Sequence, residues 1–533
     1  MGNMTKPAAT KKNPARGTPS RGPRPVAVID IGTTSIRMAM AEIMPSGEVR
    51  PLDTLILPVK IGRDTFRSRR IERRSIEEVV DVLQQFKASA QEYGIQASDQ
   101  IRVVATTAVR EASNRMMFCD RIYIATGLVV EIIDEAEVNR ITYLGIQQDL
   151  AVDDHLSNRK SVVVEVGGGS SEVLVIRNGN VLISESFRFG AVRWAERIEP
   201  YSASASQMKA VFENRCQRDI RRLVDHVGLD RDMEMIAIGG DIRFAARQLV
   251  DGWDGSRMAR IAVPDLQTLA DDVFGQDSDA LVNKFGVTFL EADTLSAALY
   301  SYLALAQQFG KDYLYVSGTN LRDGLLHDMA GGGRLKTAFR NQIIRSAVTM
   351  GRKFKFDEVH AVNVADVAHN LFVELDELHH LEGRFEQILY VAALLHEIGL
   401  FIGNRGAHKH AMYLIRHSEL FGLGKSELNL VSLVARYHRR ATPQPTHEHY
   451  TALSRRSRVI VSKLAAILRL AIALCDSRSG RICEIQCVLS PGQLTIATPG
   501  VVNLSLETLA MRQNSSMFEE VFGRRVVLRS GEA

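Results

Sequence analysis

Two glycine-containing turns in this sequence each follow an apolar segment that ends in a carboxylate. The first lies in "VAVIDIGTTSIRMAM", where Asp30 precedes Gly32 by two residues, and the second lies in "VVVEVGGGSSEVLVI", which contains Glu165. Glycine lets a phosphate approach backbone N–H groups closely, and hydroxyl side chains in the same turns add donors. We therefore predict that both turns bind phosphoryl groups, through Thr33, Thr34, Ser35, Gly167, Gly168, Gly169, Ser170 and Ser171.

Charged side chains beside the turns suggest a metal-assisted reaction on phosphate. Asp30 and Glu165 are predicted at strand ends, and Glu172 follows the second turn. Mg²⁺ prefers carboxylate oxygens, bound directly or through water. Arg110, in "VVATTAVREASNR", follows another apolar strand and could neutralise a phosphate, although a surface ion pair is the simpler alternative. A single glycine turn would also be an ordinary hairpin, but the repeated acid and turn favour a phosphate site.

The elements that must position these residues occur twice in the same order. Apolar strand, glycine turn and apolar strand begin at about residue 25 and again at about residue 159. The repeat predicts two related α/β domains, 25–158 and 159–334, on either side of a cleft. Apolar residues at helical spacing predict an all-α domain over 335–480. A disordered basic tail (1–24) and a small α+β segment (481–533) complete the expected organisation.

Composition restricts the protein class. A chain of 533 residues is too long for one hydrophobic core. No apolar run is long enough to cross a bilayer, and the net charge of +4 does not indicate nucleic acid. Five cysteines without a close C-x-x-C pair suggest a reducing compartment, without disulfides or a zinc site. We expect a cytoplasmic protein that binds neither a membrane nor a specific nucleic acid.

Several further segments occur together in one known family. They are "DIGTTS", "ATTAVREASNR", "EVGGGSSE", "FRFGAVRWAE", "IGGDIRFAAR" and "NLRDGLL". In their order and spacing the chain resembles the exopolyphosphatase and guanosine pentaphosphate phosphatase (Ppx/GppA) family, in its long form. The resemblance implies duplicated actin/sugar kinase/Hsp70-like (ribonuclease H-like) α/β domains and an HD-like helical domain.

The same resemblance implies a function. Members of the family use Mg²⁺ to release terminal phosphate from polyphosphate, or to convert pppGpp to ppGpp, with a glutamate as general base. The implied partners are therefore polyphosphate or guanosine tetra- or pentaphosphate, and a second copy of the chain in a homodimer. An actin-like ATPase or a sugar kinase would share the fold, but the segments above fit a phosphatase better.

The segment that carries the family's catalytic glutamate is altered. The family reads like "EEARLIYLG", whereas "DEAEVNRITYLG" places Val138 in the catalytic position and Glu137 one residue earlier. A shift of one residue rotates a helical side chain by about 100°, so either Glu137 or Glu135 would have to reach the attacking water. We assign the catalytic roles to Glu137, Glu165 and Arg110.

Glu165 itself replaces the usual aspartate and carries its carboxylate about 1.5 Å further from the backbone. Because Mg²⁺ requires near-ideal geometry, this change could weaken the metal site. The two departures leave a second hypothesis open, in which the protein binds polyphosphate or guanosine phosphates with little turnover and acts as a regulator.

The predicted helical domain is rich in histidine but lacks a complete HD metal site. The required His-Asp doublet is His396-Glu397, and Ile472 and Cys475 stand where carboxylates are expected, with Asp476 one position away. His369, His410 and His438 could still cluster. We expect a structural role or a channel for a polyanion, with a second active site as the alternative.

Overall fold

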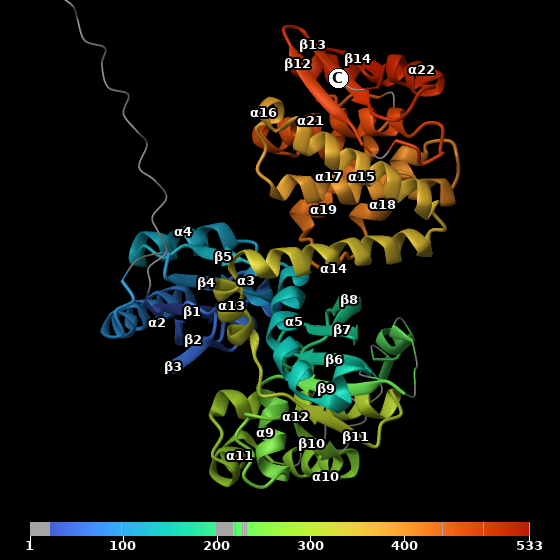
Figure 1. Cartoon of the computed structure of the whole chain (residues 1–533). Helices are drawn as coiled ribbons and strands as arrows, with labels where there is room; N and C mark the ends of the chain where they lie inside the picture. The colour runs from blue at the N-terminus through green and yellow to red at the C-terminus, as the bar shows by residue number, and fades with distance from the viewer. Residues whose placement is uncertain are drawn as a thin grey trace, which may run out of the picture.

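The computed structural model describes residues 22–96, 99–198, 217–218, 220–225, 227–228, 230, 232–274, 276–439, 441–482 and 484–531. Almost all of the predicted basic tail lies outside the described residues. The chain forms two α/β domains and a larger helical region (Figure 1). Among the described helices, none combines the length and apolar character that crossing a membrane would demand.

The first α/β domain contains a five-stranded sheet in the order β3-β2-β1-β4-β5. β1 pairs antiparallel with β2 and parallel with β4, so the first glycine turn connects two adjacent strands. The strands are β1 (Arg24–Ile31), β2 (Ser35–Ile43), β3 (Val49–Pro58), β4 (Ile101–Ala105) and β5 (Val130–Ile132). The helices are α1 (Ile61–Ser68), α2 (Arg73–Glu92), α3 (Thr107–Glu111) and α4 (Arg115–Thr126).

The second α/β domain repeats this topology. Its six-stranded sheet has the order β10-β11-β9-β6-β7-β8, so β8-β7-β6-β9-β11 corresponds to β3-β2-β1-β4-β5 and β10 is an extra edge strand. The strands are β6 (Lys160–Val166), β7 (Ser171–Arg177), β8 (Asn180–Phe187), β9 (Glu234–Ile238), β10 (Ala259–Ala262) and β11 (Tyr313–Val316). The helices are α6 (Asp154–Ser157), α7 (Ala191–Ile198), α9 (Gly240–Leu249), α10 (Val263–Phe274), α11 (Ser278–Phe285) and α12 (Phe289–Gln308).

The two glycine turns have the same backbone geometry. The Gly32 N–H donates to Ser35 O at 3.0 Å, and the Gly167 N–H donates to Ser170 O at 2.9 Å. A Cβ on Gly32 would lie 3.0 Å from Ser35 O, and a Cβ on Gly167 would lie 3.0 Å from Ser170 O. The predicted duplication is therefore confirmed in both strand order and turn.

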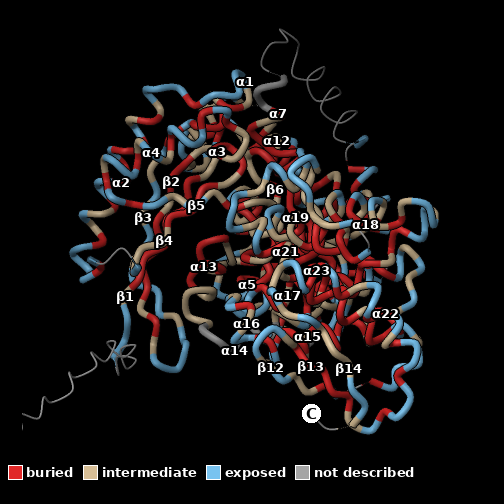
Figure 2. Tube along the Cα trace, turned by 90° about the horizontal axis from the view of Figure 1, so that it is seen from above, coloured by how far each residue is buried: buried red, intermediate tan, exposed pale blue. Residues whose placement is uncertain are grey.

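Two helices connect the domains. The first half of α5 (Glu135–Val152) packs with β1 and with α13 (Leu321–Ala330) in one apolar cluster. The second half of α5 packs against the second sheet, beside Val163 and Leu174. Seen from above, α13 runs between the first sheet and the rest of the molecule (Figure 2). The cleft between the domains is consequently closed along one side by shared helices.

The remaining residues form one helical body with a small sheet on it. Its helices are α14 (Gly332–Lys353), α15 (Glu358–Glu374), α16 (Asp376–His379), α17 (Arg384–Leu395), η1 (Ile398–Phe401), α18 (Ala407–Arg416), α19 (Lys425–Arg436), α20 (Glu448–Thr451) and α21 (Arg455–Leu474). The C-terminal elements are β12 (Gln486–Ser490), β13 (Gln493–Thr498), α22 (Ser505–Asn514), α23 (Ser516–Phe522) and β14 (Arg525–Ser530). Leu494 and Phe518, from these last elements, belong to the same core as the helices. The relation of this region to HD domains stays a prediction.

One carboxylate joins the helical region to the α/β domains. Asp134 Oδ1 accepts a hydrogen bond from the Glu137 N–H at 3.0 Å, which caps α5. Asp134 Oδ2 accepts a second from the Lys425 N–H, the first residue of α19, at 2.6 Å. Because both helix N-termini carry a partial positive charge, a single carboxylate satisfies unpaired N–H groups of two helices.

We expect Asp134→Ala to destabilise the protein more than the loss of an ordinary cap. Losing a cap costs about 1 kcal/mol, and the bond to Lys425 is lost as well. Asp277→Ala is the matched control, because among the described residues the Asp277 carboxylate accepts a hydrogen bond only from the Ala280 N–H, at 2.8 Å, to cap α11. Denaturant unfolding measures both; equal losses would show that the contact with α19 contributes nothing.

Candidate active site

The two glycine turns touch each other across the cleft. A Cβ on Gly168 would lie 2.9 Å from Thr33 Cβ, and a Cβ on Gly169 would lie 2.6 Å from Phe66 Cζ and 2.8 Å from Thr107 Cγ2. Real Cβ atoms do not approach other atoms this closely, so these positions require glycine because of close approach between domains. The predicted meeting of the two turns is observed.

A chain of polar contacts leads from the second turn into the first domain. The Ser170 hydroxyl donates to Glu172 Oε1 at 2.6 Å, and Thr107 Oγ1 lies 2.9 Å from Ser170 Oγ. Arg110 Nη2 donates to Thr107 Oγ1 at 3.1 Å, and its Nε lies 3.4 Å from Glu135 Oε1. Arg110 therefore belongs to the cleft rather than to the surface ion pair that was the alternative.

Three predicted metal ligands gather at the base of the cleft. Burial raises the pKa values of Asp30, Glu165 and Glu172, and that of Glu172 rises to about 7, partly because of the nearby Glu165 charge. Asp30 Oδ1 is buried, and within the described residues it has no hydrogen-bond partner. Mutually repelling carboxylates with an unpaired buried oxygen fit a divalent cation such as Mg²⁺.

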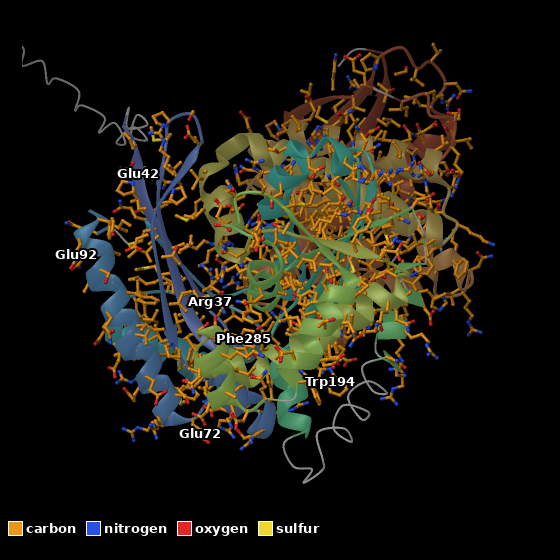
Figure 3. All side chains as sticks on the ribbon, turned by 90° about the horizontal axis from the view of Figure 1, so that it is seen from below. Arg37, Glu42, Glu72, Glu92, Trp194 and Phe285 are labelled. Atoms are coloured by element: carbon orange, nitrogen blue, oxygen red, sulfur yellow. The ribbon has the colours of Figure 1, made fainter. Side chains whose placement is uncertain are left out.

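Three arginines surround these acids. The sequence alone assigned them no role. Arg322 Nη1 lies 3.9 Å from Asp30 Oδ2, and Arg243 interacts with the Glu165 charge. Arg37, on β2, interacts with both acids and lies between the first sheet and the second domain (Figure 3). Arg243 and Arg322 stand in "IGGDIRFAAR" and "NLRDGLL", so the available signal was their position within segments typical of the family.

The two glutamates proposed for the base point to different surroundings. Glu137 accepts two hydrogen bonds from Arg140, from Nε to Oε2 and from Nη2 to Oε1, each at 2.7 Å. Glu135 instead lies beside Arg110, and its Oε2 is 2.8 Å from Lys425 Nζ. Burial alone would raise the pKa of Glu135. Arg110 and Lys425 together outweigh burial, so the pKa of Glu135 is lower than usual. The structure thus brings Glu135 to the cleft and places Glu137 in an arginine cluster.

Val138, the position at which the resemblance to the family led us to expect the base, is closed to water. Val138 is 7% exposed and packs with Val28 and Leu325 in the core shared by α5 and α13.

The predicted hydroxyl donors also differ in availability. Ser171 Oγ donates to Phe189 O at 2.7 Å, so this hydroxyl serves the second domain internally.

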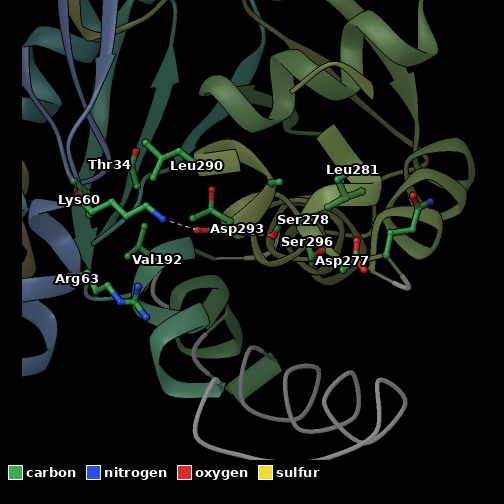
Figure 4. A pocket seen from close by; sticks show the side chains of 14 residues that line it. Thr34, Lys60, Arg63, Val192, Asp277, Ser278, Leu281, Leu290, Asp293 and Ser296 are labelled. Atoms are coloured by element: carbon green, nitrogen blue, oxygen red, sulfur yellow. Dashed lines mark hydrogen bonds and ion pairs between the residues drawn. The ribbon is translucent and has the colours of Figure 1, made fainter. Parts of the chain in front are cut away.

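A cavity of about 430 Å³ adjoins the first turn. Thr33, Thr34 and Lys60 line it from the first domain, and Asp293 and Leu281 line it from the second (Figure 4). Lys60 Nζ lies 3.0 Å from Asp293 Oδ2, and this ion pair crosses the cavity between the domains. The cavity extends the cleft away from the buried acids.

Repeated sheets and a cleft lined by both glycine turns define the class of duplicated actin-like α/β proteins. Residues 43–332 match the model of the Ppx/GppA phosphatase family, and residues 344–507 match that of Ppx/GppA phosphatase, domain III. The chain belongs to the Ppx/GppA phosphatase family.

Individual proteins are also similar to this chain. A guanosine-5′-triphosphate,3′-diphosphate pyrophosphatase from Photobacterium profundum is 24% identical over 511 residues, which are 91% of this chain and 95% of that protein. The structure of an exopolyphosphatase from Cytophaga hutchinsonii is similar with a TM-score of 0.53 at 20% identity, over 58% of this chain and 98% of the other. A family member from Aquifex aeolicus has a TM-score of 0.49 at 24% identity, over 58% of this chain and 99% of that one.

Gly169→Ala is expected to destabilise the protein by about 1–3 kcal/mol, because the new methyl group would overlap Phe66 and Thr107. The matched control is Gly383→Ala, since a Cβ there meets nothing within 4 Å and the backbone has no positive φ. Thermal unfolding distinguishes the two. An unchanged Gly169→Ala protein would mean that the second turn does not approach Phe66 and Thr107 this closely in solution.

Asp241, in "IGGDIRFAAR", yields a pH prediction. Burial raises its pKa from 3.8 to about 6, although Arg37 opposes the shift. For an acid whose pKa is higher in the folded state, stability falls as pH rises from about 3.8 to about 6, and the cost is complete above that range. Asp241→Asn should therefore raise stability at pH 8 by at most about 3 kcal/mol. The gain should vanish near pH 4, and a gain independent of pH would contradict this explanation.

Proposed function

We propose that the protein is a Mg²⁺-dependent phosphoanhydride hydrolase that releases terminal phosphate from polyphosphate, converts pppGpp to ppGpp, or does both. The observation that carries the proposal is the contact chain Glu172–Ser170–Thr107–Arg110–Glu135. It connects a glycine turn, a group of acids and a separate ionised carboxylate within one cleft. Family membership supports the phosphatase class, and the names of the two relatives above support the two substrates.

In this proposal the residues of the cleft divide into three roles. The turns at Gly32 and Gly167 present backbone N–H groups to phosphoryl oxygens, and Arg110 neutralises their charge. Asp30, Glu165 and Glu172 would hold Mg²⁺, which when bound neutralises charge on the phosphoryl oxygens. The longer side chain of Glu165 does not displace it from the group, because it still interacts with Asp30 and Glu172.

We assign the general base to Glu135 and treat Glu137 as its competitor. Helical residues two apart differ by about 200° in direction, so the two side chains leave α5 on nearly opposite sides. A base must be ionised and close to the attacking water. Glu135 has a lowered pKa and lies beside the arginine that faces the phosphate, whereas both carboxylate oxygens of Glu137 bind Arg140.

The test compares Glu135→Gln with Glu137→Gln in phosphate release from long-chain polyphosphate and from pppGpp with Mg²⁺. We expect wild-type release from at least one substrate, and a loss of about 10²–10⁴-fold in Glu135→Gln, because proton transfer contributes that much. Glu137→Gln should keep most of the activity and instead unfold at a lower temperature, since Arg140 loses a charged partner.

The opposite pattern, with activity lost only in Glu137→Gln, would assign the base to Glu137. Absence of release from both substrates by folded wild-type protein would contradict the hydrolase proposal. Retained binding of polyphosphate in that case would support the regulatory alternative, in which Val138 and Glu165 mark a site that no longer turns over.

A further inference from the structure

Three potential metal ligands meet inside the helical region, apart from the cleft acids. They are His360 on α15, His396 immediately after α17, and Glu397. One ligand atom from each lies within 4.8 Å of the others. His369, which the sequence suggested as a cluster member, instead places its Nδ1 2.8 Å from Glu386 Oε1. The observed cluster thus uses a different histidine of α15.

Both imidazoles have a ring nitrogen available to bind a metal ion. His396 is 1% exposed, and its Nδ1 lies 2.6 Å from Ala393 O. A carbonyl oxygen only accepts, so Nδ1 carries the proton and Nε2 keeps a free lone pair. His360 is 7% exposed, and among the described residues its buried Nδ1 has no partner.

The charges around the cluster favour a cation. Glu397, Asp357 and Asp476 all interact with His360, and Arg478 is the opposing charge. Arg478 Nη2 lies 2.7 Å from Glu397 Oε1, and its Nη1 lies 3.1 Å from Asp357 Oδ2. Three carboxylates against one guanidinium leave an excess of negative charge. The Arg478 guanidinium binds Glu397, the one carboxylate of the three-residue cluster. It therefore competes with any metal ion for this carboxylate.

We propose that His360, His396 and Glu397 bind a divalent transition-metal ion such as Zn²⁺, and that Arg478 weakens this binding by competing for Glu397. Two imidazoles and one carboxylate suit Zn²⁺, Mn²⁺ or Co²⁺ better than Mg²⁺, which prefers oxygen alone. Ligand atoms of a tetrahedral zinc site lie about 3.3 Å apart. The cluster therefore contracts on binding, and Glu397, at 23% exposure of its side chain, has room to move.

The ion would connect α15 to the end of α17 within the core of the helical region. His438 packs edge-on against His396, with ring centroids 5.1 Å apart, and its own Nδ1 lies 2.6 Å from Ala435 O. The site requires nothing from the phosphate cleft. It is consequently independent of whether the protein hydrolyses polyphosphate or pppGpp.

The experiment uses the full-length protein, stripped with EDTA and then held in excess Mg²⁺ so that the cleft carboxylates are occupied. Titration with Zn²⁺ should show one further site and a rise in the unfolding temperature, and bound Co²⁺ should show the intense visible d–d absorption of a four-coordinate site. We expect Glu397→Gln and His396→Gln to lower the affinity at least tenfold. Arg478→Gln should raise it several-fold, because a like charge is removed.

His369→Gln is the control, since it removes an imidazole from the same helix outside the cluster. Circular dichroism establishes that each variant is folded, and His360→Gln replaces His396→Gln if that variant is not. No additional Zn²⁺ site, or binding that survives Glu397→Gln unchanged, would overturn the proposal. Unchanged or weaker binding in Arg478→Gln would overturn the competition.

Discussion

The organisation of the cleft depends on the repulsion between buried carboxylates. Asp30 and Glu165 occupy equivalent strand ends in the two domains, and the duplicated fold forces them toward each other. Burying such charges is costly unless opposite charges compensate. Arg37, Arg243 and Arg322 supply that compensation from three separate elements. The pKa values of the acids stay raised despite these arginines, and under the proposed function a divalent cation would supply the remaining positive charge.

The duplicated α/β fold was predictable because each of its sequence signals lies within a short segment of the chain. Alternating apolar strands, the acid and the glycine turn are short-range patterns, and each recurs at the start of a domain. Arg110 and the acids at the strand ends could be identified for the same reason. The tight approach of Gly169 to Phe66 could not, since it depends on how two distant domains meet.

The change of the proposed general base from Glu137 to Glu135 shows a different limit of prediction from sequence. Asp134 caps α5 and so determines which residue starts the helix, and this start sets the direction of every side chain after it. The sequence contains that cap, but it does not reveal that Lys425 approaches the same end from the helical region. Lys425 also pairs with Glu135, so a contact between residues almost 300 positions apart forms part of the surroundings of the glutamate that lies in the cleft. His360 and Arg478 escaped notice in the same way, because α15 and the segment after α21 meet only in the folded chain.

The contact between the glycine turns also has a consequence for affinity. Gly168 and Thr33 are in close contact. If both turns bind one phosphoryl group, as the proposed function has it, Gly168 would have to move away from Thr33, and the binding-competent molecules would be those in which the domains have separated. The apparent dissociation constant then equals the intrinsic constant divided by the open fraction. Under the proposed function, substitutions that only loosen the closed contact would strengthen substrate binding without adding a ligand contact. The conformational penalty would be the same for every phosphate ester or anhydride that both turns bind.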